Sequence, residues 1–153
     1  MNKQAVLNQI LAVLNAELAS LTRAANDAFA AATDPDSKAE NKYDTRSLEA
    51  SYVARGQAKR VVELQEAVRG FEALSGSALE SGALGALVTL ETPEGLSHYF
   101  LGPSAGGTEI VHEGNEIVVI TPASALGQKL VGQRRGNAIP LRPGVMAKVV
   151  EVK

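Results

Sequence analysis

The stretch LNQILAVLNAELASLTRAANDAFAAA, from Leu7 to Ala32, decides the architecture of the N-terminal half of the chain. Its apolar residues recur in alternating steps of four and three, which is the spacing of a coiled-coil seam. The seam positions are Leu7, Leu11, Leu14, Leu18, Leu21, Ala25, Ala28 and Ala32. This pattern predicts one long helix from about Asn2 to about Ala32.

A second stripe with the same spacing follows after a short interval. Its positions are Tyr43, Ser47, Ala50, Ala54, Gln57, Val61, Leu64, Val68 and Phe71. We expect a second helix from soon after Asp36 to about Leu74, packed antiparallel to the first because the connection is short. Pairing position 7 with 68 and position 32 with 43 aligns the two stripes throughout and places the fold-back between Ser37 and Lys38.

The connecting segment is acidic and carries helix-boundary signals. Pro35 disfavours helical geometry at Asp34 and ends the first helix. Asp36 or Ser37 can cap the second helix, and Ser37 with Glu40 fits a capping box. Four carboxylates gather at this predicted tip, namely Asp34, Asp36, Glu40 and Asp44. Taken alone, they are explained by capping and by the helix dipole; the alternative is that two of them bind Mg²⁺, which prefers oxygen ligands.

The composition restricts the class of protein. The chain has 153 residues, of which 45% are hydrophobic and 21% charged, so it is long and apolar enough to fold. The formal net charge of -2 gives no global attraction to nucleic acid, and the absence of cysteine excludes disulfides and thiolate metal sites. We recognise no signal peptide and no apolar run of about 18 residues, and we expect a cytoplasmic protein without a membrane segment.

The periodicity changes after residue 75, so we predict two domains, residues 1–75 and residues 76–153. Alternating apolar segments predict strands at residues 87–91, 98–101, 117–121 and 147–152, with a hairpin turn at residues 93–95. Ser124 and Gly132 delimit a short predicted helix. The expected class is α+β, a coiled-coil hairpin followed by a small antiparallel-sheet domain. His98 and His112 are expected at the surface rather than as metal ligands or bases.

Residues 120–137 read ITPASALGQKLVGQRRGN. This segment resembles the C-terminal segment of the Gre family of bacterial transcript cleavage factors, in which a Ser-Pro, small-apolar, Leu-Leu-Gly and Gly-Asp series recurs. The N-terminal half looks like the antiparallel coiled coil with an acidic tip of the same family. The resemblance covers essentially the whole chain in the right order, and it implies an FKBP-like fold for the second domain.

The resemblance also implies a partner and a role. RNA polymerase would be the partner, with the C-terminal domain docked at the rim of the secondary channel through Ser124, Ala125 and Leu126. The hairpin would enter the channel, and Asp36 with Glu40 would help to hold the second Mg²⁺ near the 3′ end of a backtracked transcript. Asp34 and Asp44 are the alternative ligands. The polymerase would perform the cleavage, so the chain itself is not expected to be an enzyme.

Several positions depart from the family pattern. Asp36 and Tyr43 have the family spacing, but Glu40 lies one residue late and Ala39 takes its place, a shift of about 100° on a helix. Ala125 replaces the usual proline and Asn137 the usual aspartate. A channel-binding regulator that does not stimulate cleavage is therefore an alternative. A prolyl isomerase and a coiled-coil adaptor are further ones, although Tyr99 and Phe100 should point to opposite faces of one strand.

We expect a monomer, because the apolar seam is satisfied within the hairpin. An additional stripe of Val6, Ile10 and Val13 lies off the seam and is expected to be exposed.

Overall fold

The computed structural model describes residues 1–33 and 46–153, with the backbone alone described at residue 32 and residues 46–52. The described residues form two compact units. One contains residues 1–13 and 69–153, and the other contains residues 14–68. We call them the sheet unit and the hairpin unit. The first turns of the first long helix and the last turn of the second therefore group with the sheet.

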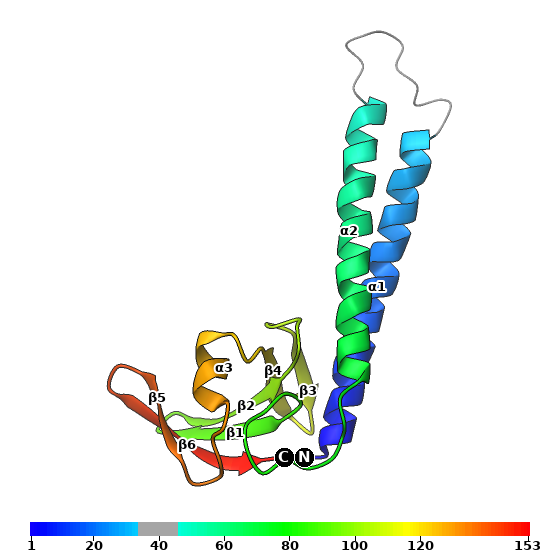
Figure 1. Cartoon of the computed structure of the whole chain (residues 1–153). Helices are drawn as coiled ribbons and strands as arrows, with labels where there is room; N and C mark the ends of the chain where they lie inside the picture. Colours follow the sequence, from blue (N-terminus) through cyan, green and yellow to red (C-terminus); the bar gives the residue numbers. More distant parts are fainter. Residues whose placement is uncertain (34–45) are drawn as a thin grey trace. The chain divides into compact units, whose positions relative to one another are not determined.

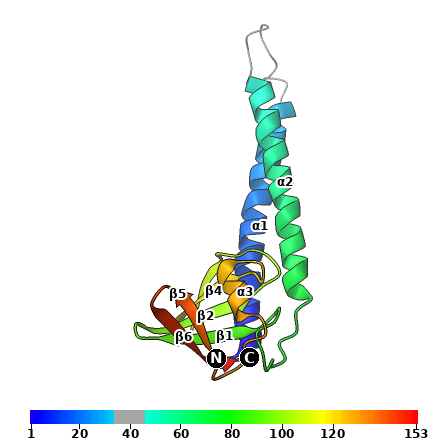
Figure 2. The same cartoon turned by 60° about the vertical axis from the view of Figure 1, so that its left-hand side comes forward.

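The hairpin unit is built from the long helices α1 (Lys3–Thr33) and α2 (Arg46–Glu72), which lie side by side in both Figure 1 and Figure 2. The two helices run antiparallel (Figure 1), and the contact of Arg60 Nη2 with Glu17 Oε1 at 3.3 Å agrees with about the predicted register. Every seam position with a described side chain is buried or half-buried, whereas Val53 and Val62, next to the seam, are more than half exposed. The predicted coiled-coil pattern is confirmed over these residues.

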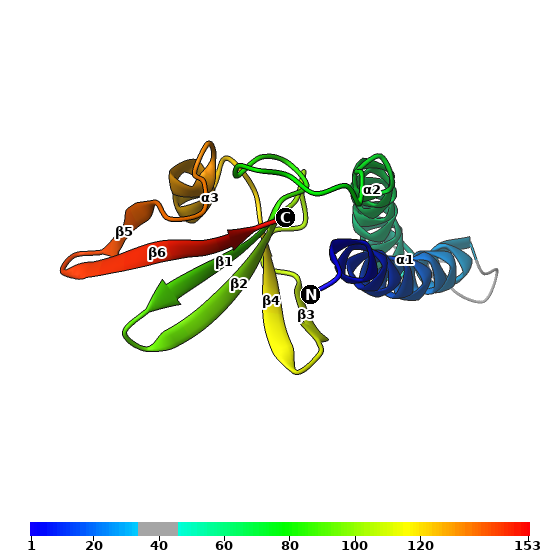
Figure 3. The same cartoon turned by 90° about the horizontal axis from the view of Figure 1, so that it is seen from below.

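The sheet unit contains six strands in the order β3-β4-β2-β1-β6-β5, which Figure 3 shows along their length. The strands are β1 (Leu87–Thr92), β2 (Gly95–Leu101), β3 (Glu109–His112), β4 (Asn115–Ile120), β5 (Ala138–Arg142) and β6 (Val145–Val152). All four predicted strands are present, and β3 and β5 are additional. The α+β class is thus confirmed. The expectation of a wholly antiparallel sheet is wrong at one pair, because β2 and β4 run parallel.

One face of the sheet carries a core that includes the short helix α3 (Ala125–Leu130). The fully buried members of this core are Ala86, Val88, Leu90, Leu101, Leu130, Ile139, Ala147 and Val149. Tyr99 and Leu126 pack against it and are half-buried. Phe100, the neighbour of Tyr99, instead stacks on Phe71 with a centroid distance of 6.1 Å. Tyr99 and Phe100 therefore point to opposite faces, as predicted.

The N-terminal turns of α1 contribute to the sheet unit. Val6 and Ile10 are completely buried, so the expectation that they form an exposed stripe with Val13 is wrong for these two residues. The side chain of Lys153 also donates to the carbonyl oxygen of Met1 at 3.0 Å. The coiled-coil seam accounts for only one side of α1, whereas the first turns of this helix also pack into a second core, which the seam pattern does not reveal.

Helix α1 has a further property that its coiled-coil pattern does not indicate. Over Lys3–Ala31 it is long and apolar enough to meet a length-and-composition criterion for a membrane-spanning helix. Many of its apolar residues are alanines, which raise hydropathy although each buries little surface. A single helix of this kind near the N-terminus is weak evidence for a membrane segment.

Candidate functional site

The segment from Thr121 to Leu130 is fixed by hydrogen bonds centred on Ser124. Ser124 is the N-cap of α3: its Oγ accepts from the backbone N–H of Gly127 at 3.0 Å and donates to the carbonyl oxygen of Thr121 at 2.7 Å. The predicted cap is confirmed. Because both hydrogen bonds are internal, the hydroxyl group is committed to holding the start of α3 in place.

Gly127 lies where no side chain fits. A Cβ atom at this position would come within 1.8 Å of the carbonyl oxygen of Thr121. Gly82 is similarly close to the carbonyl oxygen of Leu130, and it exchanges backbone hydrogen bonds with Gln133 and Gly132 at 2.7 Å. Close backbone approach at Gly127 therefore holds α3 against Thr121, and close approach at Gly82 holds the end of α3 against the segment that precedes β1.

The three predicted docking residues differ in exposure. Ala125 is exposed, Ser124 is half-buried, and Leu126 is half-buried because it packs against the core. Only Ala125 therefore presents most of its side chain to solvent. Asn137, which replaces the usual aspartate, accepts a hydrogen bond from the backbone N–H of Arg134 at 2.7 Å. The amide oxygen thus closes the turn after α3 without a carboxylate.

The predicted metal-binding residues are not placed by the structure. Asp36, Glu40, Asp34 and Asp44 all fall in residues 34–45, outside the described part of the chain. Among the residues that are described, no group of three or more His, Cys, Asp or Glu side chains could hold a metal ion. The assignment of Mg²⁺ to this segment therefore stays a prediction.

His98 is buried in the sheet, so its expected surface position is wrong. Its Nδ1 lies 3.0 Å from the hydroxyl oxygen of Thr89, the residue directly opposite on β1. Burial lowers the pKa of His98, and a hydrogen bond with Asn115 and the charge of Glu151 partly oppose this shift. The surface prediction is wrong because β2 is a central strand with β1 on one side and β4 on the other, which the pattern of a single strand does not reveal. His112 is half-buried.

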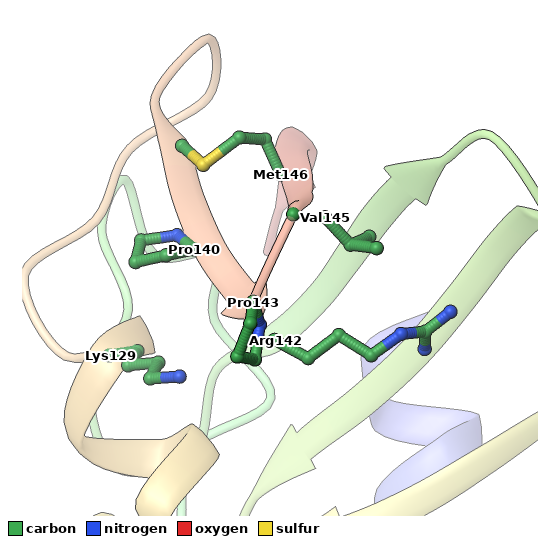
Figure 4. A pocket seen from close by; sticks show the side chains of 7 residues that line it. Lys129, Pro140, Arg142, Pro143, Val145 and Met146 are labelled. Carbon is green, nitrogen blue, oxygen red and sulfur yellow. The ribbon is translucent and has the colours of Figure 1, made fainter.

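An apolar groove of about 490 Å³, which no sequence pattern predicts, lies beside the β5–β6 hairpin (Figure 4). It is lined by Lys129 of α3 and by Pro140, Arg142, Pro143, Gly144, Val145 and Met146. Lys129 Nζ donates to the carbonyl oxygen of Leu141 at 3.3 Å, which links α3 to β5. The Pro143-Gly144 turn between two short apolar segments was the available signal for this hairpin.

Comparisons with known proteins gave matches only among solved structures. No protein-family model matches the chain, and no curated protein matches it. GreA factor homolog 1 (Gfh1) of Thermus thermophilus is 17% identical, with a TM-score of 0.39 over 97% of this chain and 93% of that one. Thermus aquaticus Gfh1 is 19% identical, with a TM-score of 0.37 over 91% of this chain and 90% of that one.

A third structure, described as the transcription factor Gfh1, is 20% identical, with a TM-score of 0.37 over 99% of this chain and 94% of that one. Identities and TM-scores in this range do not assign the chain to a family. A functional assignment accordingly has to come from the residues of this chain.

Proposed function

We propose that the chain is a Gre-like transcription factor that binds bacterial RNA polymerase through its secondary channel, in the cytoplasm. The observation that carries this proposal is the Gre-like series of residues 120–137. In this chain the series forms a capped helix, closed by Gly132 at a φ of 80° and by the turn of Asn137. Its position after an antiparallel helical hairpin with an acidic connection agrees with the same family pattern.

The proposed activity is stimulation of transcript cleavage by the polymerase. Asp36 and Glu40 would supply carboxylate oxygens to a Mg²⁺ ion held jointly with the polymerase, near the 3′ end of a backtracked RNA. Oxygen ligands of this kind suit Mg²⁺, which commonly takes only one or two protein carboxylates. A metal that is shared between two proteins need not bind tightly to this chain alone.

The position of Glu40 supports a second candidate. A one-residue displacement relative to Asp36 changes the direction of a helical side chain by about 100°. Such a displacement would separate the two carboxylates unless the connection rearranges. The second candidate is therefore a regulator that occupies the channel without stimulating cleavage.

The deciding experiment measures transcript cleavage by RNA polymerase in a stalled, backtracked complex, together with binding of the factor to the polymerase. Wild type is compared with Asp36→Ala and Glu40→Ala, and Asp27→Ala is the control because it removes an exposed carboxylate from α1. Cleavage lost in the first two variants and kept in the control supports the cleavage factor. Binding without cleavage supports the channel regulator, and no binding by wild type overturns both.

The isomerase and adaptor alternatives receive less support. Phe100 is buried against Phe71. Tyr99 lines two open pockets beside β2, but no other Tyr, Phe or Trp lines either of them, whereas ligand pockets are usually lined by several apolar and aromatic side chains. A peptide isomerisation rate above background would support the prolyl isomerase alternative. Binding to RNA polymerase would distinguish the proposed factor from a general coiled-coil adaptor.

A further inference from the structure

Charge is segregated along the second half of the sequence. Residues 70–128 contain seven glutamates and no lysine or arginine, whereas residues 117–150 contain no aspartate or glutamate. The basic residues of the latter segment are Lys129, Arg134, Arg135, Arg142 and Lys148, and all five are exposed. A protein with a net charge of -2 thus carries a local stretch of five positive charges.

Because of the strand order, the acidic and the basic segments lie at opposite edges of the sheet. Strands β3 and β4 form one edge and carry the exposed Glu109, Glu113 and Glu116 on the strands and their turn. Strands β6 and β5 form the other edge and carry Arg142 and Lys148, while Glu151 near the end of β6 is paired with Lys153. Lys129 is linked to β5 through the carbonyl oxygen of Leu141, so α3 adds a third cation to the basic edge.

The basic edge also exposes apolar side chains. Ile139 and Ala147 are cross-strand partners and both are buried in the core. The next pair, Pro140 and Met146, must face the other way because side chains alternate along a strand, and Met146 is 55% exposed. Pro140 is tolerated because β5 is an edge strand.

Lys148 lies near this apolar pair, opposite Glu91 of β1, and two further cations line the groove. The Ala138–Lys148 pair lies two positions from the Pro140–Met146 pair and therefore on the same face. Lys129 and Arg142 line the groove itself (Figure 4). Arg142 contacts the carboxylate of Glu94, but both side chains are more than half exposed, so a partner carboxylate can compete for this arginine.

We propose that the groove beside the β5–β6 hairpin binds an acidic protein segment, in which an apolar side chain contacts Pro140 and Met146 while flanking carboxylates meet Lys129, Arg142 and Lys148. Methionine is well suited to such a contact because its flexible side chain adapts to different partners. This inference does not depend on the proposed activity of the hairpin tip, and it concerns residues outside the Ser124–Leu126 segment.

The observations favour a protein segment over nucleic acid. The groove is lined mainly by proline, valine and methionine, and none of its lining residues is aromatic, whereas sites for single-stranded nucleic acid commonly stack bases on aromatic side chains. The acidic edge of a second copy is the other possible occupant. Binding of the acidic edge of one copy to the basic edge of another would assemble the protein head to tail, which can be measured.

The test begins with a random dodecapeptide library displayed on phage and selected on the immobilised full chain. We expect selected peptides to combine Asp or Glu with a large apolar residue. A synthetic copy of a selected peptide should bind Lys129→Glu and Met146→Ser roughly tenfold more weakly than wild type, because each variant removes one component of the site. Arg23→Glu is the matched control, since it makes the same charge change at an exposed position of α1.

Three results would overturn the proposal: no enrichment, enrichment of neutral or basic peptides, or equal binding by wild type and both groove variants. A single-stranded 12-mer oligodeoxynucleotide that binds as tightly, and is lost in the same variants, would assign the groove to nucleic acid instead. Sedimentation at low salt tests whether a second copy occupies the groove. Self-association of the wild type that Lys129→Glu abolishes would assign the groove to a second copy. Thermal unfolding monitored by circular dichroism verifies that each variant is folded.

Discussion

Gly127 shows how a single residue can be required by the space around it. A Cβ atom there would lie 1.8 Å from the Thr121 carbonyl oxygen and 2.8 Å from Ser124 Oγ. A side chain at position 127 is therefore incompatible with the N-cap that Ser124 forms. We predict that Gly127→Ala lowers the free energy of unfolding by roughly 1–3 kcal/mol, the usual cost of overpacking. Urea denaturation measures this change.

Gly56 of α2 provides a matched control for that substitution. No atom lies within 4 Å of the position that its Cβ would occupy. Gly56→Ala should therefore raise the stability of the helix by up to about 1 kcal/mol, in line with helix propensity. If Gly127→Ala stabilised the protein as much as Gly56→Ala, the backbone at position 127 could not lie as close to the Thr121 carbonyl oxygen as described.

His98 predicts a pH dependence. Burial holds its pKa below the ordinary value of 6.5, so between these two values the unfolded chain binds a proton that the folded chain does not. The stability due to neutral His98 is thus present above pH 6.5 and is lost as the pH falls through the lower pKa of the folded state. We predict that His98→Gln weakens the loss of stability between pH 7.5 and pH 5.5.

Urea denaturation at the two pH values measures this effect, and NMR titration of the imidazole protons measures the pKa directly. The variant also identifies which imidazole signals belong to His98, since the chain has two histidines. A pKa of His98 at or above 6.5 would contradict the prediction.

At the level of single elements, the seam of the hairpin unit makes a quantitative prediction. Leu64 is 3% exposed, whereas Val62, two positions earlier, is 51% exposed. We expect Leu64→Ala to lower the free energy of unfolding by about 2–5 kcal/mol, because it removes buried methyl groups and leaves a cavity. Val62→Ala should change it by less than about 0.5 kcal/mol. Comparable losses in both variants would show that α2 does not pack through the predicted stripe.

The elements that the sequence predicts well are those with a complete local signal. Helix α1 shows a periodic pattern over many turns, and α3 has a capping serine and a terminating glycine within one short segment. Strands β3 and β5 were missed because both are edge strands. Strand β3 has only 4 residues, and Pro140 interrupts β5, so neither shows a clear alternation of apolar and polar residues.

The candidate site also combines features that have a local sequence signal with features that depend on tertiary packing. Ser124 could be recognised as a cap because a cap depends on the next three residues alone. The burial of His98 depends on neighbours from β1 and from the β3–β4 end of the sheet, and the groove depends on α3 lying beside a hairpin that follows it in sequence. Such features arise from tertiary packing and are not written in any local pattern.

At the level of the whole molecule, the division into units does not coincide with the ends of the helices. Phe71 is part of α2 by its backbone but of the sheet unit by its contacts. It is completely buried, it stacks on Phe100 of β2, and its ring lies directly against Gly102. A substitution of Phe71 should therefore destabilise the strands rather than the hairpin unit.

We predict that Phe71→Ala destabilises the sheet unit by about 3–5 kcal/mol, the usual cost of truncating a buried phenylalanine. Hydrogen–deuterium exchange should become faster at the amides of β2 and β4, with little change at residues 14–30 of α1, since residue 71 lies outside the hairpin unit. Glu72→Ala, at the exposed next position, is the control and should leave both regions unchanged. Faster exchange confined to residues 14–30 would mean that Phe71 stabilises the hairpin unit, and the last turn of α2 would then have to be assigned to it.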